Sequence, residues 1–182
     1  MVISLKKLAG EIKIDVPDLI TRQMGKAIFE IISGKLKSMH ENELLVLDFE
    51  AIQVIDASFI DELIIKLILL SRSSLFPFYV KLKNISQAVE INIDLVFNSF
   101  SSFNRDRIVV LSSDLFSNNS YYIGSLSERE KDILDYLRIN KHSSLKDIMN
   151  LTGTRESEIK RILDELYAMR IIRKDDDIYM TV

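Results

Sequence analysis

LLVLDFEAIQVIDASFIDELIIKLILL, residues 44–70, is the stretch of sequence that decides the fold. It opens with an apolar run, Leu44 to Leu47, which ends at an aspartate, and a short apolar run with polar ends is typical of a strand buried on both faces. Asp56 and Ser58 follow where a helix must start, and their side-chain oxygens can cap its first N–H groups. The stretch therefore predicts a central strand, a turn and a helix.

The predicted helix has two unequal faces. At about 100° per residue, most of its apolar side chains fill one continuous half, which is the half expected to cover the sheet. Ile65 and Leu69 fall on the other half, among charged residues that include Asp61 and Glu62. We therefore expect both aliphatic side chains to point away from the core. Scattered exposed aliphatics are common, and a second packing surface for another subunit or domain is the alternative interpretation.

The pattern LDFxxIxxIDxSFxDEL, residues 47–63, resembles the STAS-like family of unknown function found in bacterial and archaeal proteins. It is similar, more distantly, to the anti-sigma-factor antagonist (STAS) domains. The resemblance covers about residues 19–97 and includes Thr21 and Arg22. It implies an interaction domain whose partner could be a histidine-kinase-like ATPase. We expect the docking surface to comprise Asp56, Ser58, Asp61, Glu62, Ile65 and Leu69.

Antagonist STAS domains carry a phosphoacceptor hydroxyl at the first Ser of an Asp-Ser-Ser/Thr-Gly turn. The matching residues here are Asp56, Ala57, Ser58 and Phe59. Ala57 stands at the acceptor position and has no hydroxyl. A phosphorylation switch of that kind would therefore require Ser58 to substitute for it.

Strand and helix patterns alternate over the rest of residues 1–113. Residues 2–16 alternate polar and apolar twice around Gly10, which predicts a hairpin of half-buried strands. Pro17 and Asp18 predict the start of a helix. Further strands are expected near residues 78–82 and 107–111, with a helix after the first of them. This alternation predicts a mainly parallel or mixed sheet with helices on its faces.

The remaining chain is expected to be a linker and a second domain. Residues 114–122 are rich in Ser and Asn and have no period, which predicts a linker. Residues 123–182 contain a capping box at Ser127, two further helices around a Thr-Gly turn, and a terminal hairpin. This order resembles a winged helix-turn-helix, in which Thr154 is expected to cap the third helix.

In a winged helix the third helix enters the major groove, so the polar residues near its start would face bases and phosphates. Glu156 and Glu158 share this surface and the hairpin tip holds three aspartates, an arrangement that repels the DNA backbone. The alternative is a winged helix used for protein contact, its cations paired with neighbouring acids. The candidate DNA contacts are Thr154, Arg155, Ser157, Lys160 and Arg161.

Composition excludes several classes of chemistry. The chain has no Cys, and its two histidines, His40 and His142, lie far apart, so no metal, cofactor or catalytic site is expected. A cluster of acids that includes Asp48 is explained more simply by capping and docking than by catalysis. The first residues lack a signal peptide, and Lys66 interrupts the longest apolar run, so a cytoplasmic protein without membrane contact is expected.

The sequence thus predicts an α/β protein: a STAS-like domain over residues 1–113, a linker over 114–122 and a winged helix over 123–182. One hypothesis for function is a non-enzymatic, DNA-binding transcriptional regulator. The alternative is a protein-interaction switch of the anti-sigma-antagonist type, whose winged helix contacts protein. A homodimer contact through Ile65 and Leu69 is a further expectation.

Overall fold

The computed structural model describes residues 1–14, 17–114 and 119–182. Within these residues the chain forms two compact units, Met1–Ser125 and Leu126–Val182. The protein is mixed α/β, and its largest sheet contains both parallel and antiparallel pairs. No helix of the described ranges is both long and apolar enough to cross a membrane.

The first unit is built on a five-stranded sheet in the order β1-β3-β5-β6-β7. The first four strands run parallel and β7 is antiparallel to β6. β3 pairs on both sides, so the predicted central strand is confirmed. The strands are β1 (Val2–Ser4), β3 (Leu44–Asp48), β5 (Tyr79–Ile85), β6 (Val109–Asp114) and β7 (Ser120–Gly124).

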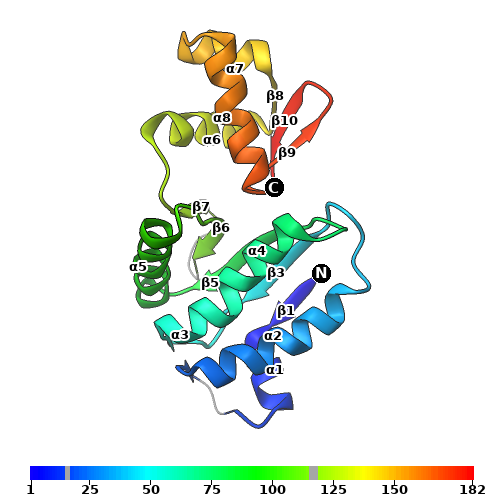
Figure 1. The fold of residues 1–182 in the computed structure, drawn as a ribbon, viewed down its shortest axis with the longest axis vertical. Helices are drawn as coiled ribbons and strands as arrows, with labels where there is room; N and C mark the ends of the chain where they lie inside the picture. Colours follow the sequence, from blue (N-terminus) through cyan, green and yellow to red (C-terminus); the bar gives the residue numbers. More distant parts are fainter. Residues whose placement is uncertain (15–16, 115–118) are drawn as a thin grey trace. The chain divides into compact units, whose positions relative to one another are not determined.

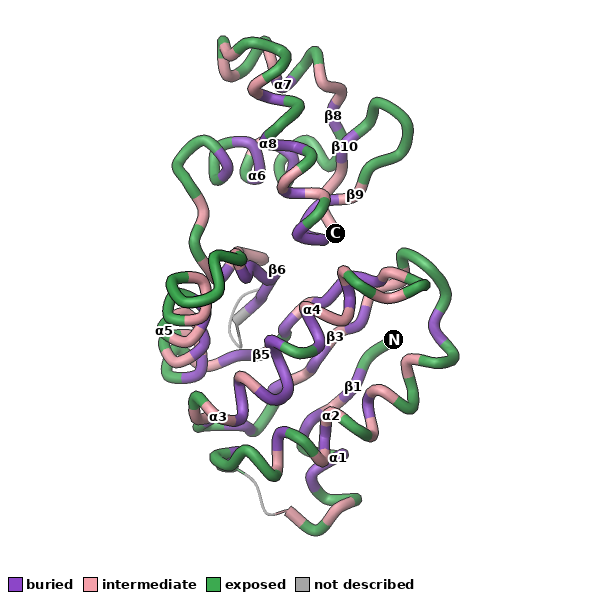
Figure 2. Tube along the Cα trace, in the orientation of Figure 1, coloured by how far each residue is buried: buried purple, intermediate pink, exposed green. Residues whose placement is uncertain are grey.

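Helices cover this sheet, with α2 and α4 across one face (Figure 1). Ile28, Ile32 and Leu67 pack in one hydrophobic cluster with Leu45 and Leu47 of β3. Figure 2 shows buried positions in purple along α2, α4 and the strands. A small parallel pair, β2 (Asp18–Leu19) and β4 (Val54–Ile55), lies beside the main sheet. The helices are α1 (Leu5–Glu11), α2 (Arg22–Leu36), α3 (Ala57–Phe59), the π-helix η1 (Ile60–Ile65), α4 (Lys66–Ser73) and α5 (Gln87–Asn104).

The predicted hairpin over residues 2–16 is wrong. β1 pairs with β3 in parallel, and the chain then enters α1. Ser4 caps this helix by accepting a hydrogen bond from the Lys7 N–H, and Leu5 and Leu8 are buried at helical spacing. Buried residues therefore recur every three to four positions, as in a helix, and a serine caps its start. These two features outweigh the strand-like alternation of polar and apolar residues. Residues 15 and 16 of the predicted hairpin lie outside the described residues.

The helix predicted from Pro17 and Asp18 starts later, at Arg22. Asp18 instead belongs to β2, which pairs with β4. The hydroxyl of Thr21 accepts a hydrogen bond from the Met24 N–H at 3.2 Å and provides the N-cap. The long-range strand pairing explains the later start, because a residue in a strand cannot also be in the first helical turn.

Residues 57–73 are helical throughout, as predicted, but η1 interrupts the α-helical period. A π-helix bonds residue i to i+5 rather than i+4, so a wheel at 100° per residue loses its phase across it. Ile65 is only 2% exposed and lies in the core, and Leu69 is partly buried against that core. The prediction that both side chains point away from the core is therefore wrong. Their burial removes the basis for a homodimer contact through them.

The predicted linker also differs from the structure. Residue 114 ends β6, and residues 120–122 lie in β7, whose backbone bonds to β6. Residues 115–118 lie outside the described residues. The division between the two units falls after Ser125, beyond the last strand of the sheet.

The second unit has three helices and a three-stranded antiparallel sheet in the order β8-β10-β9. The capping box of Ser127 with Glu130 is confirmed, and a second one joins Ser144 to Asp147. Its elements are α6 (Glu128–Asn140), β8 (His142–Ser144), α7 (Leu145–Thr152), α8 (Glu156–Ala168), β9 (Ile172–Asp175) and β10 (Ile178–Thr181).

The start of α8 differs from the prediction in one respect. Arg155 is the N-cap residue, and no side-chain hydrogen bond caps the helix there. The Thr154 hydroxyl instead donates to the Thr152 carbonyl oxygen at 3.3 Å. The preceding turn places Gly153 at a φ of 61°, a left-handed conformation that suits glycine after a helix. This turn sets Thr154 one residue too early to cap α8.

Candidate functional site

A groove of about 590 Å³ lies between η1 and α5 in the first unit. Two large apolar side chains of α5 are exposed at it: Leu95 is 63% exposed and Phe103 is 85% exposed. Such exposure at a concave surface is typical of a site that another molecule covers. The groove is lined by Arg22, Ala57, Ser58, Asp61, Ile65, Leu95, Val96, Ser99, Phe100, Phe103 and Asn104.

The turn at one wall of the groove is held by a carboxylate. Asp56 Oδ1 accepts a hydrogen bond from the Phe59 N–H at 2.7 Å and so caps the helix. The Ser58 hydroxyl donates to Asp56 at 3.0 Å. Ser58 is half-buried and its hydroxyl is bonded to the capping carboxylate, whereas Ala57, the first residue of α3, is exposed.

Arg22 connects α2 to η1 through two carboxylates. Its Nη1 donates to Asp61 Oδ2 at 3.0 Å and also contacts Glu62. Lys66 contacts Glu62 from one turn further along. The Lys66 ammonium, and with it the Arg22 guanidinium, holds the pKa of Glu62 below its usual range, although burial opposes this shift. The pairing thus joins the start of α2 to η1.

The structure separates the six predicted docking residues. Ser58, Asp61 and Ile65 line the groove. Asp56 caps the helix through the Phe59 N–H and does not line the groove. Glu62 is only 7% exposed and is enclosed by its two cations, and Leu69 does not line the groove.

Sequence reasoning missed the opposite wall of the groove. Leu95 and Phe103 belong to α5, which forms the helix expected after residues 78–82, but neither residue is among the predicted docking residues. Leu95, Ser99 and Phe103 recur every four residues, which is a helical spacing and the signal that could have revealed a shared face.

The acidic residues after the central strand do not form a metal-binding cluster. Asp48 accepts hydrogen bonds from Asn84 at 2.8 Å and from the Glu50 N–H at 3.0 Å. Asp56 and Asp61 are engaged as described above. Across residues 1–14, 17–114 and 119–182, no three His, Asp or Glu side chains are grouped so that they could hold a metal ion.

In the second unit, the predicted DNA contacts lie around the start of α8. Arg155, Ser157, Lys160 and Arg161 are exposed, and Thr154 is half-buried. Their charges are partly compensated, because Lys160 contacts Glu156 and Arg161 contacts Glu165, both at 2.6 Å.

The hairpin turn between β9 and β10 also acts on this face. Glu156 raises the pKa of Lys160, and Asp177 of the turn adds to the effect. Arg155 makes no ion pair with any residue that the structure describes. The outer face of α8 therefore presents one uncompensated cation and two cations that share their charge with acids.

No protein-family model matches the chain, and no curated protein matches it. The groove beside Ser58 and the outer face of α8 are therefore the features from which we infer a function.

Proposed function

We propose that the chain is a non-enzymatic regulatory protein that works by docking. Its first unit is a STAS-like interaction domain, and its second unit is a winged helix. Two observations support this reading: the SFxDEL pattern borders a groove, and the second unit has helix, strand, helix, helix and a two-stranded hairpin in that order. In this proposal, binding of a partner at the groove is the signal that the protein passes to its winged helix.

The observation that carries the proposal is the exposure of Leu95 and Phe103 at the groove beside Ser58. Burying an aliphatic or aromatic side chain of this size contributes about 1.5–3 kcal/mol. Two of them supply an anchor for a protein partner, and Arg22 and Asp61 at the same groove supply orientation. The STAS-like resemblance implies a histidine-kinase-like ATPase as one such partner.

Site-specific photo-crosslinking tests the docking role. The photoreactive residue p-benzoylphenylalanine replaces Leu95 in cells that naturally produce the protein, and the adduct is identified by mass spectrometry. We expect a covalent adduct with one other protein. Phe103→Asp on the same chain should abolish that adduct, because it places a charge in the apolar contact.

A matched control carries the same photoreactive residue at Leu75, an exposed leucine of the first unit that does not line this groove. It should not capture the same partner. Absence of an adduct from position 95, or an identical adduct from both positions, would contradict docking at this groove.

DNA binding through α8 is a second candidate function. It is favoured by the exposure of Arg155, Lys160 and Arg161 at and near the start of that helix. Exposed ion pairs contribute only about 0–1 kcal/mol, so phosphates can displace Glu156 and Glu165 from the two paired cations. In this case the protein is a transcriptional regulator.

Fluorescence anisotropy of a labelled random duplex tests this second candidate. We expect binding at low salt that weakens steeply at physiological salt, because neutralised phosphates release counterions. Lys160→Ala/Arg161→Ala should abolish it. If the protein does not bind duplex DNA even at low salt, the DNA-binding role is wrong and α8 is instead a surface for protein contact.

A further inference from the structure

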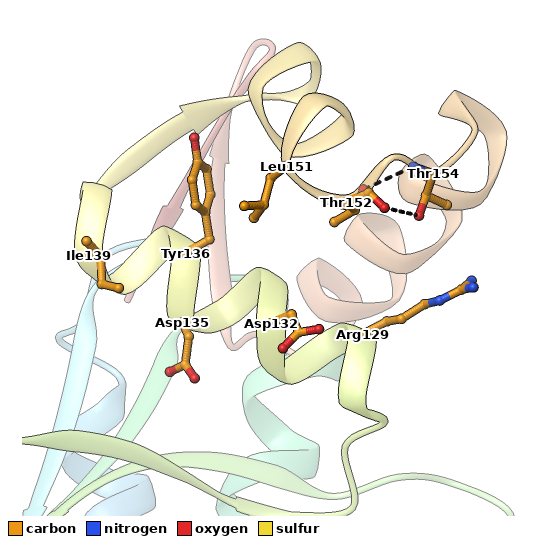
Figure 3. A pocket seen from close by; sticks show the side chains of 8 residues that line it. All are labelled: Arg129, Asp132, Asp135, Tyr136, Ile139, Leu151, Thr152 and Thr154. Carbon is orange, nitrogen blue, oxygen red and sulfur yellow. Dashed lines mark hydrogen bonds between the residues drawn. The ribbon is translucent and has the colours of Figure 1, made fainter.

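The second unit contains a groove of its own, between α6 and the end of α7, with a volume of about 530 Å³. In Figure 3, Tyr136 of α6 and Leu151 of α7 both project into the space between the two helices, and Ile139 lies at the end of α6. Ile139 is 75% exposed and Leu151 is 50% exposed. The groove therefore presents apolar surface that the unit itself does not cover.

Charges at the rim of this groove are unequal. The lining cation Arg129 contacts Glu158 of α8, so its charge is already compensated. Asp135 contacts Arg138 at 3.0 Å. Asp132 makes no ion pair with any other described residue and is exposed at the groove. The uncompensated charge beside the apolar surface is thus negative.

We propose that this groove docks an amphipathic helix of a partner protein, whose apolar side chains are flanked by lysine or arginine. Apolar side chains of the helix pack against Tyr136, Ile139 and Leu151, and a cation on its flank contacts Asp132. Grooves that bind amphipathic helices use this combination of apolar anchors and rim charge. The inference goes beyond the proposed function, because it uses neither the groove beside Ser58 nor the cations of α8.

The test uses the full chain and a fluorescein-labelled 18-residue helix of leucine and lysine with all leucines on one face. A matched peptide carries glutamate in place of each lysine. We expect saturable binding of the leucine-lysine helix at physiological salt and none of the leucine-glutamate helix. Ile139→Asp and Asp132→Lys should each weaken the affinity by about tenfold or more.

The control variant is Leu75→Asp, which changes an exposed leucine of the first unit that lines neither groove and should leave the affinity unchanged. Three outcomes would overturn the proposal: no saturable binding, an equal loss of affinity in Leu75→Asp, or no effect of Ile139→Asp. Sedimentation velocity adds a fourth. If the chain is a dimer that Ile139→Asp converts to monomers, a second copy occupies the groove and the proposal is wrong.

Discussion

Gly25 of α2 lies directly against Glu62 of η1, because a Cβ at Gly25 would be 2.9 Å from the Cβ of Glu62. The same Cβ would be 3.1 Å from the carbonyl oxygen of Phe59. The two helices therefore approach so closely at this point that a side chain at position 25 would not fit without a shift of its neighbours. This approach brings Arg22, at the start of α2, within reach of Asp61 and Glu62.

Gly25→Ala should lower the free energy of unfolding by about 1–3 kcal/mol, because backbone atoms cannot yield to the added methyl as a flexible side chain can. Urea denaturation measures the change. Gly34→Ala is the matched control on the same helix, since its Cβ would meet no described atom within 4 Å. That variant should gain about 0.5–1 kcal/mol from helix propensity. Equal stability of the two variants would rule out the close approach.

Ile65→Ala should destabilise the chain by about 2–5 kcal/mol, the usual cost of a truncated core side chain. Its side chain is 2% exposed, although its spacing in the sequence predicted a surface position. Leu95→Ala at the same groove should change stability by no more than about 0.5 kcal/mol. Thermal and urea unfolding of both variants provide the comparison. A neutral Ile65→Ala would show that the π-helical phase is wrong.

Glu62 makes stability depend on pH in one direction. Its pKa in the folded chain lies below the ordinary value of 4.5, chiefly because of Lys66. A carboxylate with a lowered pKa stabilises the fold above that ordinary value, and the contribution disappears as pH falls through the folded value.

The urea midpoints of the chain and of Glu62→Gln should therefore differ at neutral pH and converge at acid pH. Glu30→Gln changes an exposed carboxylate of α2 and serves as the control, with little pH-dependent difference expected. A gap between the chain and Glu62→Gln that widens on acidification would have the wrong sign for this ion pair.

Removing the acids on α8 separates its two candidate roles. Glu156→Gln/Glu165→Gln frees Lys160 and Arg161, so a DNA-binding α8 should gain about tenfold in affinity for duplex DNA at low salt. Glu11→Gln/Glu30→Gln makes the same change in net charge within the first unit, and should have a smaller effect. An equal gain in both double variants would indicate a general charge effect rather than an interface on α8.

Local sequence by itself determined the elements whose physics is local. The apolar run of β3, the capping box at Ser127, the helix start at Ser144 and the terminal hairpin depend on neighbours a few residues away, and each forms as its pattern predicts. Only the tertiary structure decided the rest. Residues Val2–Ser4 form a strand because they pair in parallel with β3, more than forty residues later in the chain. The π-helical turn of η1 moved Ile65 into the core, and α5 supplied the second wall of the groove. These outcomes depend on partners tens of residues away, which no local period encodes.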